Sequence, residues 1–177
     1  MRAKHEAKIR GVEISFLVSD MTSMSEIIEG NFDLVAAMDN ALPHLSSEQV
    51  RRSLSAIGSK LAQNGRFIAS IRDYDGLLSQ RPTMQQPAFY GDRGERRFVH
   101  QVWDWIDATI YIVHLYITEE SNHTWTTHHF VSEYRCILRS ELSYELESAG
   151  FKDVQWLMPG ESDYYQPIVL ARWDPAS

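Results

Sequence analysis

The chain has little of several features that would narrow its function. It holds a single cysteine, Cys136, so it can form no internal disulfide, which is typical of a reducing compartment. None of its apolar runs approaches the roughly 18 residues that a membrane-spanning helix needs. The charged residues that follow Met1 leave no place for the apolar segment of a signal peptide. These absences predict a cytoplasmic protein with no membrane partner.

Positive charge is also scarce. Lys and Arg number 17 against 24 Asp and Glu, which gives a net charge of −7. The one basic cluster, Arg93 with Arg96 and Arg97, is interrupted by Glu95, and such a mixture is typical of a solvated loop. Proteins that bind nucleic acid through its phosphates need the opposite balance. We therefore expect no nucleic-acid partner.

Two further kinds of site are missing. None of the nine glycines has another glycine two residues away, so the chain lacks the glycine-rich turn that approaches a nucleotide-type cofactor. The seven histidines show no metal-ligand spacing, and the adjacent His128 and His129 should point to opposite faces of a strand. We predict no metal site, and we find no convincing acid/base pair.

What is present is an alternation of strands and helices in the first 75 residues. Residues 12–18, 32–38 and 66–71 are expected to be strands, and each ends in a polar cluster. The clusters contain Asp20, then Asp39, Asn40 and His44, then Arg72, Asp73 and Tyr74. Crossover helices between such strands predict a parallel sheet with all three clusters along one edge.

The helices have their own signals. Residues 1–10 are expected to form a helix that Gly11 ends, and 26–30 a short amphipathic piece. Ser46 and Gln49 have capping-box spacing, and the apolar face that follows runs to Leu61 before Asn64-Gly65. Ser140 is expected to cap a last helix that Gly150 ends.

From residue 76 the composition changes. Residues 76–97, rich in Gly and Pro, predict a long loop, and residues 98–104, 108–118 and 124–134 predict an antiparallel meander. Its aromatic residues either form a core or shape a substrate pocket. The final strands, 154–157 and 168–173, are expected to pair antiparallel. We expect one domain over 1–177, with an α/β part (1–75), the loop and meander insertion (76–138) and a terminal helix with two strands (139–177).

Four stretches in this order carry a resemblance to a known family: Leu17-Val18-Ser19-Asp20-Met21, Asp39-Asn40-Ala41-Leu42-Pro43-His44, Ile71-Arg72-Asp73-Tyr74-Asp75, and Glu147-Ser148-Ala149-Gly150-Phe151 followed by Tyr164 to Val169. The chain resembles the later two-thirds of class I S-adenosylmethionine-dependent methyltransferases, and within them the glycine/sarcosine N-methyltransferase-like enzymes. The resemblance implies a Rossmann-like methyltransferase sheet that is N-terminally truncated, because the family's glycine-rich unit and the next strand would precede residue 1.

The resemblance also implies roles for single residues around the cofactor. Asp20 would accept a hydrogen bond from the adenine amino group, and Met21 would pack near the ring. Met38 and Asp39 would pass along the cofactor, and His44 would lie beside its methionine end. The alternative for Asp20 is a helix N-cap, and for His44 packing at a helix start.

Two residues would hold the methyl acceptor. Asn40 corresponds to a position that binds the acceptor's amine or carboxylate, although an Asn after a strand is also a common turn former. Arg72 resembles the arginine that grips a substrate carboxylate in a planar fork. The alternative for Arg72 is a salt bridge to Asp73 or Asp75.

Two functions follow. The first is methyl transfer from S-adenosylmethionine to a small-molecule acceptor that carries an amine or a carboxylate. The second is a non-catalytic methyltransferase remnant that binds a small molecule or another chain. The second reading rests on the missing sheet neighbour of residues 12–18, which a homodimer, a swapped element or a partner chain would supply.

Overall fold

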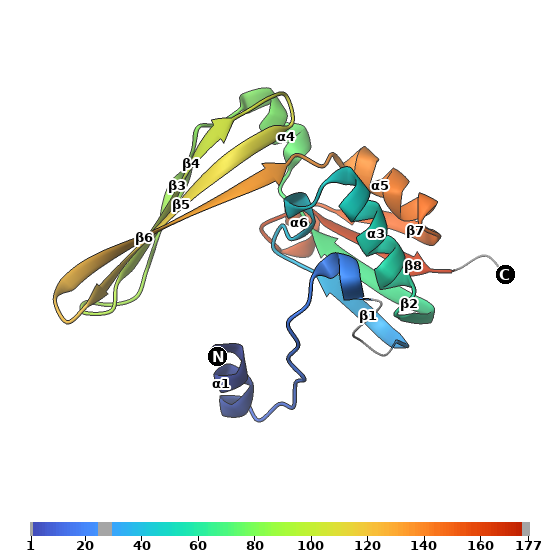
Figure 1. Cartoon of the computed structure of the whole chain (residues 1–177), viewed down its shortest axis with the longest axis horizontal. Helices are drawn as coiled ribbons and strands as arrows, with labels where there is room; N and C mark the ends of the chain where they lie inside the picture. The colour runs from blue at the N-terminus through green and yellow to red at the C-terminus, as the bar shows by residue number, and fades with distance from the viewer. Residues whose placement is uncertain (1, 25–29, 175–177) are drawn as a thin grey trace.

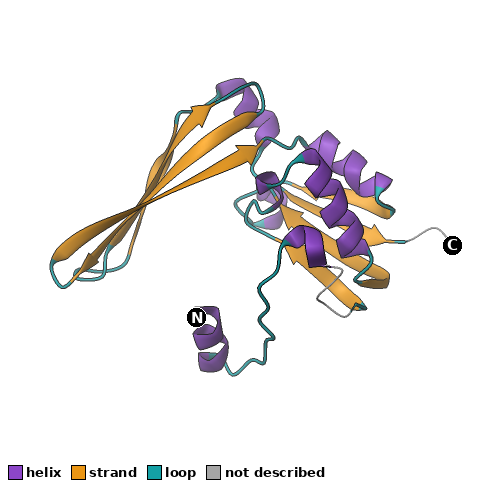
Figure 2. Ribbon diagram, in the orientation of Figure 1, coloured by secondary structure: helices purple, strands orange, loops and turns teal. Residues whose placement is uncertain are grey.

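The computed structural model describes residues 2–24 and 30–174. A four-stranded sheet forms its centre, in the order β1-β2-β8-β7. β1 (Phe32–Ala37) pairs parallel with β2 (Leu61–Ser70), while β8 (Ile168–Trp173) pairs antiparallel with β2 and with β7 (Phe151–Leu157). Helices α3 (Ser47–Gly58) and α5 (Arg139–Ser148) lie on one face of this sheet (Figures 1 and 2). The predicted α/β architecture is confirmed, and among the described residues only β1 and β2 pair in parallel.

Helix α3 connects the two parallel strands. Its capping box is present as predicted: the Ser46 side chain accepts from the Gln49 N–H, and the Gln49 side chain accepts from the Ser46 N–H. The helix ends at Gly58, however, and Leu61 already belongs to β2. Asn64 has a φ of 63° and lies where the register between β1 and β2 shifts. Asn64-Gly65 therefore forms an irregularity within β2. Our prediction that this pair ends the helix is wrong.

A second sheet projects from the first and contains β3 (Met84–Tyr90), β4 (Arg97–Trp105), β5 (Ile110–Ser121) and β6 (Thr124–Arg135), all antiparallel (Figure 1). The meander is confirmed. The prediction of a long loop over 76–97 is wrong, since this stretch contains most of α4 (Tyr74–Gln80) and all of β3. Pro87 had suggested a loop, but it lies in an edge strand, where a proline is tolerated.

The start of α5 also differs from the prediction. The helix begins at Arg139, so Leu138 and not Ser140 is its N-cap residue, and the Leu138 side chain makes no capping bond. Asp75 Oδ2 accepts from the Arg139 N–H instead, at 3.2 Å. Gly150, with a φ of 100°, follows the helix as predicted. A short helix α6 (Pro159–Ser162) precedes β8.

The N-terminal region contains α1 (Arg2–Ile9), followed as predicted by Gly11 at a φ of 65°. The predicted strand over 12–18 is wrong: this segment joins no sheet and is largely exposed. Within the described residues no strand lies beside it, and a strand needs a neighbour for its backbone groups. A 3-10 helix, η1 (Met21–Ser23), follows. Most of the predicted amphipathic piece at 26–30 lies outside the described residues.

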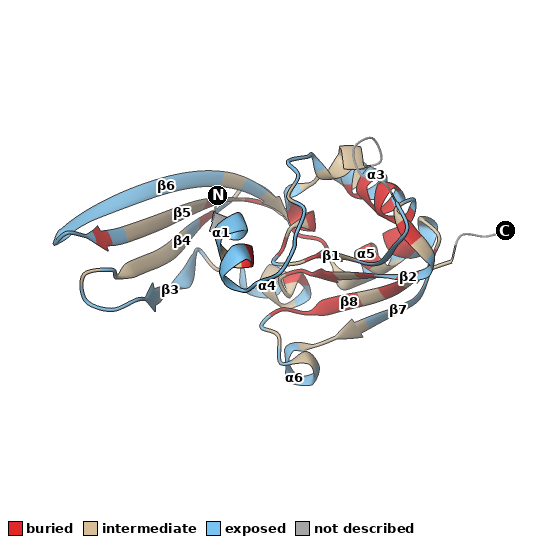
Figure 3. Cartoon of the chain, turned by 90° about the horizontal axis from the view of Figure 1, so that it is seen from below, coloured by how far each residue is buried: buried red, intermediate tan, exposed pale blue. Residues whose placement is uncertain are grey.

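Both sheets contribute to one buried cluster. Phe67 and Val169 come from the first sheet, and Trp103 and Tyr111 come from the second. Figure 3 shows the buried residues concentrated in α3, in α5 and in the strands beneath them. Among the described residues, no helix combines the length and apolarity required to cross a membrane.

Candidate functional site

The polar residues after β1 are tied to the end of β2. Asp39 and Asn40 have left-handed backbones, with φ values of 61° and 63°, which Asp and Asn tolerate better than most residues. The Asp39 N–H donates to Ser70 Oγ at 2.7 Å, and the Asn40 N–H donates to the Ser70 carbonyl at 3.1 Å. Because β1 and β2 are parallel, their carboxyl ends meet here, as predicted for this edge of an α/β sheet.

The Asn40 side chain links the two strand ends. It is 3% exposed; its Oδ1 accepts from the Arg72 N–H at 3.0 Å, and its Nδ2 donates to the Tyr74 hydroxyl at 3.0 Å. Its left-handed backbone is the conformation of a turn residue, as in the alternative that we considered. Asn40 positions the backbone of Arg72, and both ends of its amide are already bonded within the protein.

Arg72 extends from this edge toward the meander. Its Nη1 donates to the Tyr111 hydroxyl at 2.8 Å and its Nη2 donates to Gln101 Oε1 at 3.0 Å. The guanidinium carbon lies 4.7 Å from the centre of the Trp103 ring and 5.2 Å from that of Tyr134. All of these partners are neutral, and none of the described carboxylates pairs with Arg72.

The alternative partners that we considered for Arg72 are engaged elsewhere. Arg139, at the start of α5, forms ion pairs with Asp73 and, at 3.5 Å, with Asp75. The alternative of a salt bridge from Arg72 to Asp73 or Asp75 is thus wrong. Arg139 binds both carboxylates, and Arg72 has only neutral partners.

The charge of the site follows from its burial. Burial opposes the cationic form of Arg72, yet the hydroxyl groups of Tyr111 and Tyr74 hold its pKa above the ordinary value. Burial, reinforced by Arg72, lowers the pKa of His44, which lies in η2 (Leu42–His44) with its ring 4.1 Å from that of Tyr134. Burial raises the pKa of Tyr74 and that of Tyr111. At neutral pH the direct partners of the Arg72 cation are therefore uncharged, while the carboxylates of Asp39 and Asp73 line the same cavity without pairing with it.

A cavity of about 550 Å³ opens between the two sheets at this point, a size that suits a small ligand. Three of the seven predicted site residues line it: Asp39, Asn40 and Arg72. Opposite the strand ends, the Tyr165 hydroxyl donates to Asp39 Oδ1, and Gln166 accepts from Ser70 Oγ at 3.0 Å. Asp39 itself is exposed, so its carboxylate faces the opening.

The other predicted residues have different positions. His44 reaches the cluster through its contact with Tyr134, and the half-buried Met38 immediately precedes Asp39. Asp20 is the N-cap of η1, where its Oδ1 accepts from the Thr22 N–H at 2.7 Å, and Met21 packs against the core. Asp20 shares no hydrogen bond or ion pair with the cluster, so the structure brings together two of the three predicted polar clusters.

Several residues of the site carried no clear signal in the sequence. Gln101 follows His100 on β4, and an uncharged amide within a strand carries no pattern that marks a site. The aromatic residues of the meander were expected to form either a core or a pocket: Trp103 belongs to the core and also lines the cavity, whereas Tyr111 is fully buried and contacts the site through its bond with Arg72. Within the described part of the chain, no three His, Cys, Asp or Glu residues converge in a way that could hold a metal ion.

Comparison with known proteins gives structural matches. A methyltransferase of Clostridium acetobutylicum that depends on S-adenosylmethionine has a TM-score of 0.77 at 14% identity, over 99% of this chain and 70% of that one. The sugar N-methyltransferase KedS8 of Streptoalloteichus has a TM-score of 0.72 at 12% identity, over 98% and 67%. CalS10 of Micromonospora echinaspora, an amino pentose methyltransferase solved with S-adenosylmethionine bound, has a TM-score of 0.64 at 13% identity, over 88% and 63%.

No family model and no curated protein matches the chain. At these identities the structural matches establish the fold: the chain has the Rossmann-like α/β fold of S-adenosylmethionine-dependent methyltransferases. It spans between 63% and 70% of the lengths of these three chains.

Proposed function

We propose that this chain takes part in methyl transfer from S-adenosylmethionine to a small amine that carries a carboxylate. The observation that carries the proposal is Arg72, a largely buried cation with only neutral partners at the edge of a cavity. A buried charge without a counter-ion is costly, and an anionic ligand would offset that cost. A carboxylate also matches the planar fork of a guanidinium group.

The geometry leaves room for such a ligand. A guanidinium has five N–H donors, and two of those of Arg72 are used by Tyr111 and Gln101. Those two acceptors, together with the Trp103 ring, fix the plane of the group. A pre-oriented donor set loses little side-chain freedom when it binds a ligand.

The amine part of the proposal rests on similarity of fold. KedS8 is a sugar N-methyltransferase and CalS10 is an amino pentose methyltransferase. Both support an amine acceptor for this fold, while Arg72 favours an acceptor with an added carboxylate. The resemblance to glycine/sarcosine N-methyltransferases supports the same combination.

The residues at the end of β1 are compatible with the cofactor. When bound, S-adenosylmethionine supplies an electrophilic methyl group on a sulfonium centre. The exposed carboxylate of Asp39 places a negative charge at the opening of the cavity, which suits a cationic group. CalS10, which shares the fold, was solved with S-adenosylmethionine bound.

The protein would act mainly by orientation. Arg72 would anchor the acceptor's carboxylate, and Trp103 and Tyr134 would shield that end of the cavity from water. Holding two reactants in line contributes up to roughly 7–11 kcal/mol in favourable cases. The amine must react in its neutral form, and the ammonium product that forms when the methyl group leaves the sulfonium centre would then release its proton to solvent.

Calorimetric titration of the full chain with S-adenosylmethionine and S-adenosylhomocysteine tests the proposal. We expect saturable binding that Asp39→Asn weakens and that Asp20→Ala weakens if Asp20 reaches the adenine. Arg51→Met is a matched control, because Arg51 pairs with Glu145 away from the cavity. If the folded chain binds neither compound, the proposal of methyl transfer by this chain is wrong, and the alternative of a non-catalytic binding domain is favoured.

A further inference from the structure

The outer edge of β1 is open. In the sheet order β1-β2-β8-β7, β1 pairs only with β2 among the described residues. Its side chains Phe32 and Leu34 are 43% and 56% exposed. An open strand edge that carries apolar side chains is a template for pairing with another strand.

The opposite edge of the same sheet is protected. β7 has a register shift between Lys152 and Gln155, and Asp153 there has a φ of 53°. Such bulges prevent the pairing of edge strands. The register between β1 and β2 also shifts, between Phe32 and Leu34, but the extra residues lie on β2 and no residue of β1 has a positive φ.

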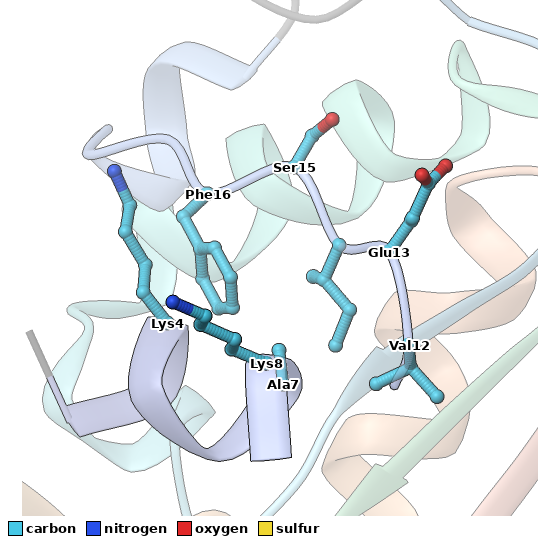
Figure 4. A pocket seen from close by; sticks show the side chains of 8 residues that line it. Lys4, Ala7, Lys8, Val12, Glu13, Ser15 and Phe16 are labelled. Atoms are coloured by element: carbon cyan, nitrogen blue, oxygen red, sulfur yellow. The ribbon is translucent and has the colours of Figure 1, made fainter. Parts of the chain in front are cut away.

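The chain also contains a strand-like segment without a partner. The N-terminal arm, residues 12–18, is extended and connects α1 to the turn before η1 at a distance from the sheets (Figure 1). Its side chains alternate in direction: Phe16 points toward α1, whereas Glu13 and Ser15 point away (Figure 4). The arm and α1 enclose an open cavity of about 650 Å³.

The arm exposes apolar surface as β1 does. Ile14 is 56% exposed, Leu17 is 62% exposed, and Val18 is fully exposed. The alternation and the exposure are those of a strand that has not found its neighbour. Seven residues of arm correspond in length to the six residues of β1.

Charge favours a second copy of the chain as the neighbour. Residues 1–11 contain four Lys or Arg and one Glu, a net charge of +3, so the remaining residues carry −10. The charged residue within β1 is acidic, Asp33, and it is exposed. The basic α1 therefore complements the acidic body of another copy.

We propose that the arm of one copy adds as a strand to the outer edge of β1 in a second copy, and that the second copy returns the same contact. The exchange is reciprocal, so it closes as a two-fold dimer and leaves no open edge at β1. It uses main-chain hydrogen bonds from both segments and covers Leu34 and Ile14. The proposal does not depend on the proposed methyl transfer.

Light scattering coupled to size exclusion tests the dimer. We expect the full chain to elute with twice its mass of 20.4 kDa, with a concentration-dependent monomer fraction. Ile14→Lys and Leu34→Lys should each give the monomer. Val131→Lys is the matched control, because Val131 is also 56% exposed but lies on β6. Circular dichroism shows whether each variant is folded. A wild-type monomer at every concentration, or a dimer that both variants keep, would overturn the proposal.

Disulfide trapping locates the contact. Ile14→Cys and Ser15→Cys chains, tested separately because these residues face opposite sides, are mixed with Leu34→Cys chains under mild oxidation. Cys136 does not interfere, since it is buried and burial raises its pKa to about 12. We expect a mixed disulfide dimer with one of the two arm variants. A disulfide that forms only within one chain carrying both substitutions would show that the arm folds back on its own strand, and the proposal would be wrong.

Discussion

Arginine residues lie beside aromatic rings at both ends of the meander, and their charges are handled differently. At the far tip, Arg96 packs 5.1 Å from the Trp125 ring and forms a two-pronged pair with Glu120, at 2.7 and 3.0 Å. At the strand ends, Arg72 also lies against aromatic rings but has only neutral partners. A structural arginine has its counter-ion within the chain. One without a counter-ion is available to a ligand.

The largest expected effect comes from removing the unpaired cation. Arg72→Met should weaken binding of sarcosine, in the presence of S-adenosylhomocysteine, by roughly 10- to 100-fold, since a hydrogen bond to a charged group contributes about 1.5–3 kcal/mol. Arg72→Lys should not restore the affinity, because an ammonium group lacks the planar fork. Calorimetry measures both. Arg96→Met should leave the affinity unchanged, and equal losses for Arg72→Met and Arg96→Met would break the comparison.

A smaller effect is expected from the group that orients Arg72. Tyr111→Phe removes the acceptor of the Arg72 bond and a 3.0 Å contact with the Tyr74 hydroxyl. We expect a loss of about 1–3 kcal/mol in the free energy of unfolding, because buried partners are left unsatisfied, and weaker sarcosine binding. Urea denaturation and calorimetry report the two quantities. Tyr116→Phe on the same strand is the control and should change neither.

The ion pair between Arg96 and Glu120 should contribute to the free energy of unfolding, and this contribution should depend on pH. The bonds from Arg96 and Gly94 lower the pKa of Glu120 to about 2, from 4.5. The stabilisation is therefore present above pH 4.5 and is lost as the pH falls toward 2. Glu120→Gln should lower the urea midpoint at pH 7, and the difference from wild type should shrink below pH 4.5. A difference that stays constant with pH would contradict the ion pair, and sarcosine binding at pH 7 should not change.

The smallest effect concerns His44. Burial and the nearby Arg72 lower its pKa below 6.5. The neutral form stabilises the fold above pH 6.5, and this contribution is lost as the pH falls through the lower folded-state pKa. His44→Gln should therefore lose less stability than wild type between pH 7 and pH 5. His123→Gln, in an exposed turn, should behave like wild type in the same thermal unfolding series.

Local signals predicted much of the fold. The Ser46 capping box, the β1 and β2 strands and the meander are encoded in short patterns, and the parallel pairing brought Asp39, Asn40 and Arg72 together as expected. The errors arose where distant residues decide. The arm looks like a strand but has no described neighbour, and Asn64-Gly65 serves a strand irregularity because the strand begins at Leu61.

The most important feature of the site could not be read from the sequence. Asp73 and Asp75 follow Arg72 so closely in the sequence that an ion pair from Arg72 to one of them was a reasonable alternative. Arg139 lies 66 residues beyond Asp73 in the sequence. It forms ion pairs with both carboxylates only because α5 packs against the strand ends. Gln101 and Tyr111 likewise reach Arg72 through the folding of the meander.

The central claim is that the Arg72 cation selects a carboxylate-bearing amine for methylation. The most direct test supplies methyl-labelled S-adenosylmethionine to the full chain with sarcosine or with dimethylamine, which is sarcosine without its carboxylate. We predict labelled product from sarcosine alone, and its loss in Arg72→Met but not in Arg51→Met. Equal labelling of both amines, or no labelling of either, would contradict the account.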